Sequence, residues 1–241
     1  MLKHIYALII GLAVTAAVAG ENNTNTVSGP FFKSKVQVEA GYTTINSING
    51  NTYLKDAGYA SVTLAATNKI VTPYISATYL PKGAESATHL TAGLEKQFVL
   101  WSVDSTVFAN YTRHNVTGAD LQAVGVKSTD EYSAGLRINN FPLVTPSIRY
   151  YDTVAGDNHG AAVGLEKALT WEKFTLTPGG EYGRNINHAT KWWQAGGSLT
   201  YKLTENFTPF VDARVFDNDA QAGFVKQDLQ AGVTAGLRFT F

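Results

Sequence analysis

Residues 229–241 alternate strictly between apolar side chains and other side chains. The apolar positions are Leu229, Ala231, Val233, Ala235, Leu237, Phe239 and Phe241. The intervening positions include Gln230, Thr234 and Arg238. Because successive side chains of an extended strand point to opposite faces, this period of two predicts a strand with one apolar and one polar face.

Eleven further segments show the same period. The twelve predicted strands centre on residues 36–42, 60–66, 71–79, 90–94, 99–111, 132–138, 144–150, 161–165, 174–182, 193–203, 207–215 and 229–241. Once their ends are included, each approaches the 9–11 residues or so that a tilted strand needs to cross a membrane. An even number of strands suits a closed antiparallel barrel. A soluble β-sandwich is the alternative that shares this alternation.

Aromatic residues favour the barrel, because they gather near the two ends of the apolar face. Tyrosines lie near the C-terminal ends of five odd-numbered strands: Tyr42, Tyr79, Tyr111, Tyr150 and Tyr182. The opposite rim carries Phe98, Trp101, Phe141, Trp171, Phe174, Tyr201, Phe207, Phe239 and Phe241. Two aromatic belts are expected of a lipid-facing wall, since amphipathic rings favour the headgroup region. A sandwich gives no reason for this sorting.

The predicted connections alternate in length. Short links follow the even strands, at residues 67–69, 139–142, 168–172 and 204–206. Longer polar links follow the odd strands, at residues 46–56, 81–88, 113–130, 152–159, 183–190 and 217–227. Short periplasmic turns and long external loops are typical of membrane barrels. Within the first long link, Asn49-Gly50 is a strong turn signal.

Both chain ends resemble those of Gram-negative outer-membrane β-barrel proteins, whose chains characteristically end in Phe. That resemblance implies that Phe241 is read by the barrel-assembly machinery. Residues 1–4 form a short start that contains the basic Lys3, the run from residue 5 to 17 is apolar, and residues 17–19 are small, which is the pattern of a cleaved signal peptide. The sequence therefore predicts a signal peptide at residues 1–19, a periplasmic tail at 20–34 and an all-β, closed antiparallel transmembrane barrel at 35–241.

Composition narrows the functional classes. The chain has no cysteine, which excludes disulfides and a lipoprotein anchor. Its 19 basic and 19 acidic residues argue against nucleic acid as a partner. The predicted partners are outer-membrane lipid, lipopolysaccharide and small polar solutes, with the protein acting as a monomer in the cell outer membrane. No cofactor is predicted.

Charged residues on the polar face are the candidate functional groups. The predicted cations of the lumen are Lys35, Arg137, Arg149, Lys202, Arg214 and Arg238; the anions are Glu39, Glu95, Asp104, Glu131, Glu166, Glu181, Asp212 and Asp228. These charges could pair to plug a small barrel, or line a wet and weakly selective pore. Numerous lumen-facing glycines favour a narrow channel. The candidate pore-lining residues, placed away from the rims, are Arg137, Arg149, Arg214, Asp104, Glu181 and Asp212.

In size and strand count the chain resembles the small monomeric porins that pass acidic oligosaccharides. The resemblance is architectural and implies an outer-membrane channel for passive diffusion of small polar solutes or ions. One alternative is a structural or adhesion barrel acting through its external loops. A barrel lipase or protease is the other, since His89, His114, His159 and His188 are predicted in or beside external loops. No catalytic or metal-binding motif is recognised, and the protein is expected not to be an enzyme.

Overall fold

The computed structural model describes residues 33–48, 51–67, 71–82, 85–100, 102–117, 128–139, 141, 143–154, 158–187, 190–219 and 229–241. Its strands are β1 (Lys33–Ile48), β2 (Asn51–Thr67), β3 (Thr72–Lys82), β4 (Glu85–Leu100), β5 (Val103–Thr117), β6 (Ser128–Ile138), β7 (Thr145–Thr153), β8 (Asn158–Glu166), β9 (Leu169–Trp171), β10 (Phe174–Asn185), β11 (Lys191–Tyr201), β12 (Phe207–Asn218) and β13 (Gln230–Thr240). No helix within these ranges is long and apolar enough to cross a membrane.

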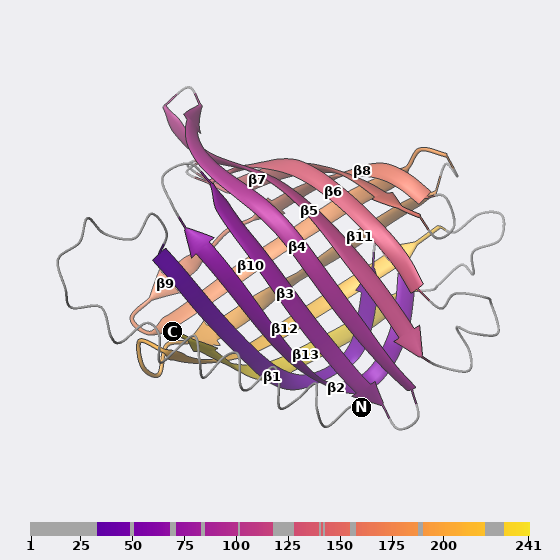
Figure 1. Ribbon diagram of the computed structural model, residues 1–241. Helices are drawn as coiled ribbons and strands as arrows, with labels where there is room; N and C mark the ends of the chain where they lie inside the picture. Colours follow the sequence, from indigo (N-terminus) through magenta and orange to yellow (C-terminus); the bar gives the residue numbers. More distant parts are fainter. Residues whose placement is uncertain are drawn as a thin grey trace.

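The strands close into one antiparallel barrel (Figure 1). β1 pairs with both β2 and β13, and Phe241 exchanges two backbone hydrogen bonds with Val36 at the seam. The short β9 and the longer β8 both pair with β10, one after the other along its length. β8 and β9 therefore share one strand position beside β10, so the thirteen strands make twelve positions. The closed, twelve-stranded antiparallel fold predicted from the alternation is confirmed.

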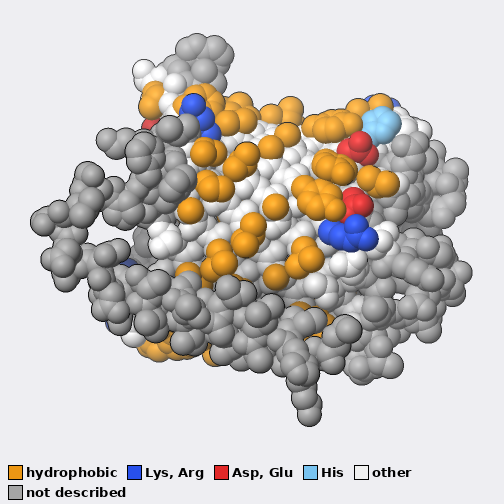
Figure 2. Space-filling view, viewed as in Figure 1, with side chains coloured by type: hydrophobic (Ala, Val, Ile, Leu, Met, Phe, Trp, Pro, Cys, Tyr) orange, Lys and Arg blue, Asp and Glu red, His pale blue; other side chains and the backbone are white. Residues whose placement is uncertain are grey.

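Apolar side chains at the predicted positions point outward. Ile75 is 56% exposed, Leu94 53%, Ile148 53% and Leu165 56%. Figure 2 shows hydrophobic side chains spread over the outer wall, with the visible charged groups nearer the strand ends. A water-soluble protein rarely exposes so continuous an apolar surface. This surface has the character of a wall that faces lipid.

Aromatic residues mark the two ends of that wall. Tyr42, Tyr150 and Tyr182 are each about half exposed on the outside. At the other rim Trp171 stacks on Phe174, whose ring lies 4.7 Å from that of Tyr201. Phe207 and Phe239 stack across β12 and β13, also with centroids 4.7 Å apart. Neighbouring strands thus bring rings that are distant in sequence into contact at this rim.

The prediction of one strand over residues 99–111 is wrong at its N-terminal end, because a turn between β4 and β5 lies there. β4 runs on to Leu100, which pairs with Val103, and Ser102 turns the chain with a φ of 67°. Residues 96–100 pair with β5 but not with β3, so the hairpin projects beyond the barrel rim, at the upper left of Figure 1. The alternation of apolar residues continues across this tight turn, so the sequence pattern gave no sign of a turn.

All six predicted long links and two of the four short links contain strand residues. β1 and β2 stay paired through the expected loop at 46–56, and β3 and β4 pair through most of 81–88. The expected turn at 168–172 contains β9, and the chain reverses after it at Glu172, whose φ is 51°. Backbone pairing extends past the apolar wall because a hairpin needs no buried face to continue. The predicted signal peptide and almost all of the predicted tail lie outside the described residues.

Candidate functional site: the barrel lumen

Inward-facing positions carry the polar half of the alternation. Because neighbouring strands are in register, inward residues form rows that run around the lumen. Along one such row the chain places Arg137, Ser147, Gly164, Glu181 and Gln194 on five strands that pair in turn, from β6 to β11. Residues separated by dozens of positions in sequence therefore meet across one or two strands.

Four arginines of the lumen are each ion-paired with a carboxylate. Arg137 lies 3.9 Å from Glu166, and Arg238 binds Glu39 at 2.6 Å across the β1–β13 seam. Arg214 binds Asp212, its neighbour on the same face of β12, at 2.7 Å. Such pairing leaves these groups charged but holds each cation beside an anion, so their fields largely cancel at a distance.

Arg149 is the most enclosed of these cations. Its Nε donates to Glu181 at 2.6 Å and a terminal nitrogen lies 3.9 Å from Glu131. Its guanidinium also lies over the rings of Tyr151 and Trp192, at 5.2 and 5.6 Å from their centroids. Gln194 donates to the second oxygen of Glu181. A charged hydrogen-bonded cluster stacked on two rings is a rigid feature of this wall.

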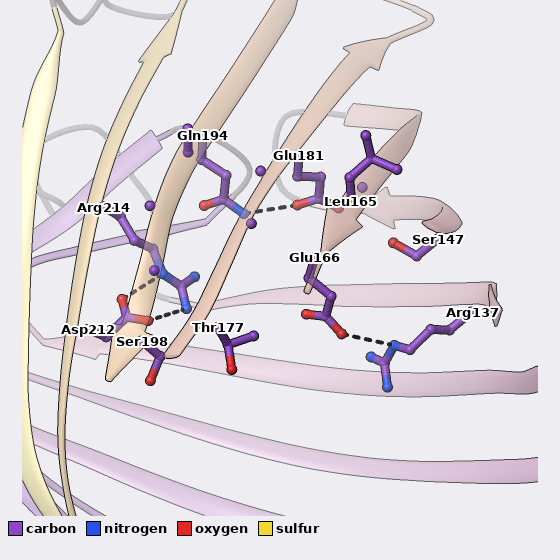
Figure 3. Close-up of a pocket in the computed structure, with 16 residues that line it drawn as sticks. Arg137, Ser147, Leu165, Glu166, Thr177, Glu181, Gln194, Ser198, Asp212 and Arg214 are labelled. Carbon is purple, nitrogen blue, oxygen red and sulfur yellow. Dashed lines mark hydrogen bonds and ion pairs between the residues drawn. The ribbon is translucent and has the colours of Figure 1, made fainter. Parts of the chain in front are cut away.

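Two adjacent cavities lie between the walls of the lumen. One, of about 330 Å³, is lined by β6, β7, β8, β10, β11 and β12. The other, of about 470 Å³, reaches round to β1, β2, β3 and β13. They share Gln194, Ser198, Asp212 and Arg214. Figure 3 shows Arg137 reaching toward Glu166 and Arg214 toward Asp212 at the edge of the first cavity, with Ser147, Thr177 and Ser198 beside them.

The six pore-lining candidates are not all brought together. Arg137, Glu181, Asp212 and Arg214 line the first cavity, and Arg149 adjoins it through Glu181. Asp104 does not lie away from the rims as predicted. It is the second residue of β5, exposed beside the projecting β4–β5 turn, and lines neither cavity. Its misplacement follows from the hidden turn. That any of the six lines a conducting pore stays a prediction.

The opposite side of the lumen carries hydroxyl groups. Thr63 bonds Ser76 at 2.9 Å and Thr91 bonds Thr112 at 2.9 Å, each across a strand pair. Ser133 donates to Asn110, whose amide donates to the Tyr74 hydroxyl. We call Ser61, Thr63, Ser76, Thr78, Thr91 and Thr112 on β2–β5 the hydroxyl wall, and Arg137, Arg149, Glu166, Glu181, Asp212 and Arg214 on β6–β12 the ion-pair wall.

Sequence reasoning missed the aromatic residues of the inner face, which in the described part of the chain include Tyr59, Tyr74, Phe108, Tyr151, Trp192, Phe210 and Phe216. All of these except Phe216 lie over glycines of a neighbouring strand. A Cβ on Gly135 would stand 2.6 Å from the Phe108 ring, and one on Gly236 would stand 2.8 Å from the Tyr59 hydroxyl. The glycines therefore make room for aromatic rings that pack over them, and do not simply widen the lumen. The alternation of the sequence could have placed these aromatic residues on the inner face. Which glycine each ring covers depends on the register between strands, which the alternation does not give.

The histidines are also placed differently from expectation. His89 and His114 lie within β4 and β5, not in loops, and form a direct cross-strand pair. Their Nδ1 atoms contact one another and their ring centroids are 4.6 Å apart. His159 is the second residue of β8, and His188 lies outside the described residues. No cluster of three or more potential metal ligands occurs in the described part of the chain.

The fold resembles those of solved outer-membrane porins, although comparisons of sequence find no relative. No protein-family model matches the chain, and no curated protein matches it in sequence. Among solved structures, a KdgM porin superposes with a TM-score of 0.55 at 10% identity, covering 85% of this chain and 99% of that one. A NanC porin superposes with a TM-score of 0.53 at 12% identity, covering 85% and 98%.

An outer-membrane channel from Pseudomonas putida F1 gives a TM-score of 0.51 at 8% identity, covering 90% of this chain and all of the other. One KdgM structure is described as a complex with disordered oligogalacturonate. At such low identities the likeness is one of fold. The chain therefore shares the closed barrel of outer-membrane porins, over nearly the whole length of those proteins.

Proposed function

We propose that this protein is a bacterial outer-membrane channel through which small polar solutes diffuse passively, with little preference for charge. The observation that carries the proposal is the lumen itself: adjacent cavities lined by hydroxyl, amide and ion-paired groups inside a barrel with an apolar outer wall. The fold shared with porins supports the same conclusion. In this proposal the barrel works as a monomer and catalyses no reaction.

Weak charge preference follows from the pairing of the arginines. An ion in a narrow pore responds to the net field of the wall. Since Arg137, Arg149 and Arg214 each lie beside a carboxylate, neither cations nor anions meet a continuous track of one sign. The acidic oligosaccharide named for one structural neighbour would gain little here, and uncharged polyhydroxylated solutes suit the cavities better.

Assembly is the second part of the proposal. The terminal Phe241 pairs with Val36 at the closing seam and exposes 54% of its surface. Its exposed ring would be accessible to the barrel-assembly machinery. The outer apolar wall then contacts membrane lipid, and lipopolysaccharide on the outer leaflet.

The test is conductance of the purified barrel in planar bilayers. We expect discrete steps with a cation-to-anion permeability ratio near one. Arg149→Glu should shift that ratio toward cations, because it replaces the shared partner of Glu131 and Glu181 with a third carboxylate. Thr91→Ser, on the hydroxyl wall, is the matched control and should leave the ratio unchanged.

A silent bilayer from correctly folded protein would overturn the channel. Lipase and protease assays on the same preparation would then separate a barrel enzyme from an adhesion barrel that acts through its external loops. Loss of outer-membrane insertion on deleting Phe241 is the expected result for the assembly step.

A further inference from the structure

We infer that His89 and His114 form a binding site for one divalent late transition-metal ion, such as Zn²⁺, Ni²⁺ or Cu²⁺. The inference is independent of whether the barrel conducts. It starts from register: the two histidines occupy directly opposed positions of β4 and β5, on the inner face of the barrel. Two imidazoles presented side by side by rigid strands are a ready pair of ligands, since imidazole suits these metals.

The geometry at the pair favours a shared ion. Both rings point the same nitrogen, Nδ1, toward the other, and the rings meet edge to face at 72°. Two bonds of about 2.05 Å at a tetrahedral angle would hold the nitrogens about 3.3 Å apart. A small opening of the contact, by rotating either ring, brings both lone pairs onto one ion. Water from the lumen can fill the remaining positions.

The other nitrogen of His114 is consistent with this arrangement. His114 is only 7% exposed, and its Nε2 is one of three buried side-chain polar atoms without a hydrogen-bond partner in the described part of the chain. Nε2 lies on the ring edge away from the His89 contact, where a water molecule would satisfy it. A neutral imidazole that carries its proton on Nε2 presents the lone pair of Nδ1 to a metal ion. His89 is less buried, which leaves the pair reachable from the lumen.

The inward neighbours of the pair on β3, β4 and β5 carry hydroxyl groups. The next inward pair along the same two strands is Thr91 and Thr112, and Thr78 flanks His89 on β3. Asp130 of β6 also acts electrostatically on His114, so one carboxylate lies nearby. The two groups that face each other are imidazoles, however, and the site would take hard Ca²⁺ or Mg²⁺ poorly, since those ions prefer oxygen ligands. Selectivity for late transition metals follows from the imidazoles themselves.

The experiment is calorimetric titration of the folded, detergent-solubilised barrel with Ni²⁺, and separately with Zn²⁺. We expect one site per barrel. His89→Ala and His114→Ala should each weaken binding by more than about tenfold, since even the loss of an outer-shell partner costs about that much. His159→Ala, on β8, is the matched control and should bind as the unaltered protein does. Ca²⁺ should not bind at this site.

Folding of each variant is checked by its compact, heat-sensitive migration in gels. His89→Gln keeps a polar side chain should the alanine variant fail to fold, and must also lose the site. Absence of binding by the unaltered barrel, or binding that survives both His89 and His114 substitutions, would overturn the inference.

Discussion

The two walls of the lumen obey the same alternation but contain different chemistry. On the hydroxyl wall, neighbouring strands meet through short neutral pairs such as Thr63 with Ser76. On the ion-pair wall, long side chains reach over an intervening strand, as Arg149 on β7 does to Glu181 on β10. The hydroxyl pairs carry no charge, whereas the long paired groups fix where charge lies. Of these two walls, the ion-pair wall is therefore the one that we expect to set the ion preference of the proposed channel.

The outer and inner faces of the barrel should differ in their tolerance of charge more than the two lumen walls do. Two adjacent residues of β3, one on each face, test this difference. Ile75→Arg places a cation on the exposed apolar wall and should cost about 2–4 kcal/mol of folding free energy if this position lies near the midplane. Ser76→Arg, one residue on, faces the lumen and should cost far less while making the channel prefer anions. Urea unfolding in lipid vesicles measures both; equal costs would show that the facing is misassigned.

Breaking the ion-pair wall should have the next largest effect. Arg149→Met leaves Glu181 and Glu131 without their cation, and the Arg149 side chain is only 21% exposed. Exposed ion pairs contribute about 0–1 kcal/mol and loss of a buried partner costs about 3–5, so we expect about 2–3 kcal/mol. The same unfolding measurement applies, and Arg149→Lys should recover part of the loss. An unchanged stability would mean that the cluster is not formed.

Glycines covered by an aromatic ring occur on both walls. Adding a side chain at such a glycine should lower the free energy of unfolding on either wall. Gly135→Ala on β6 would bring a Cβ within 2.6 Å of the Phe108 ring and against backbone as well. Overpacking of this kind costs about 1–3 kcal/mol. At Gly58 a Cβ would meet its nearest atom at 3.8 Å, so Gly58→Ala is the control and should be nearly neutral. If Gly135→Ala left the free energy of unfolding unchanged, these glycines would not be needed to make room for the rings.

The hydroxyl wall should respond least. Thr91→Val removes one partner of the 2.9 Å bond to Thr112 and keeps the side-chain shape. Because lumen water can replace the lost partner, we expect about 0.5–1 kcal/mol, the ordinary net value of one hydrogen bond. Ion preference should not change. A shift in permeability ratio as large as that of Arg149→Glu would erase the distinction between the walls.

The sequence by itself determined which residues face inward. Alternation is a local property of extended backbone, so Arg137 and Thr106 could be assigned to the polar face and Ile148 to the apolar one without any neighbour. Strand number, aromatic belts and the closing role of residues 229–241 followed from the same pattern. Strand ends did not, because pairing continues past the apolar wall and because alternation ran unbroken across the turn at Ser102.

Contacts between residues were decided by tertiary structure. Glu39 and Arg238 meet because the barrel closes, although 199 positions separate them. Arg149 meets Glu181 because β8 places β7 and β10 two strands apart in a fixed register. The same register opposes His89 to His114 and sets Phe108 on Gly135. Register is a property of strand pairs, so no single segment of sequence contains it, and the chemistry of the lumen depends on it throughout.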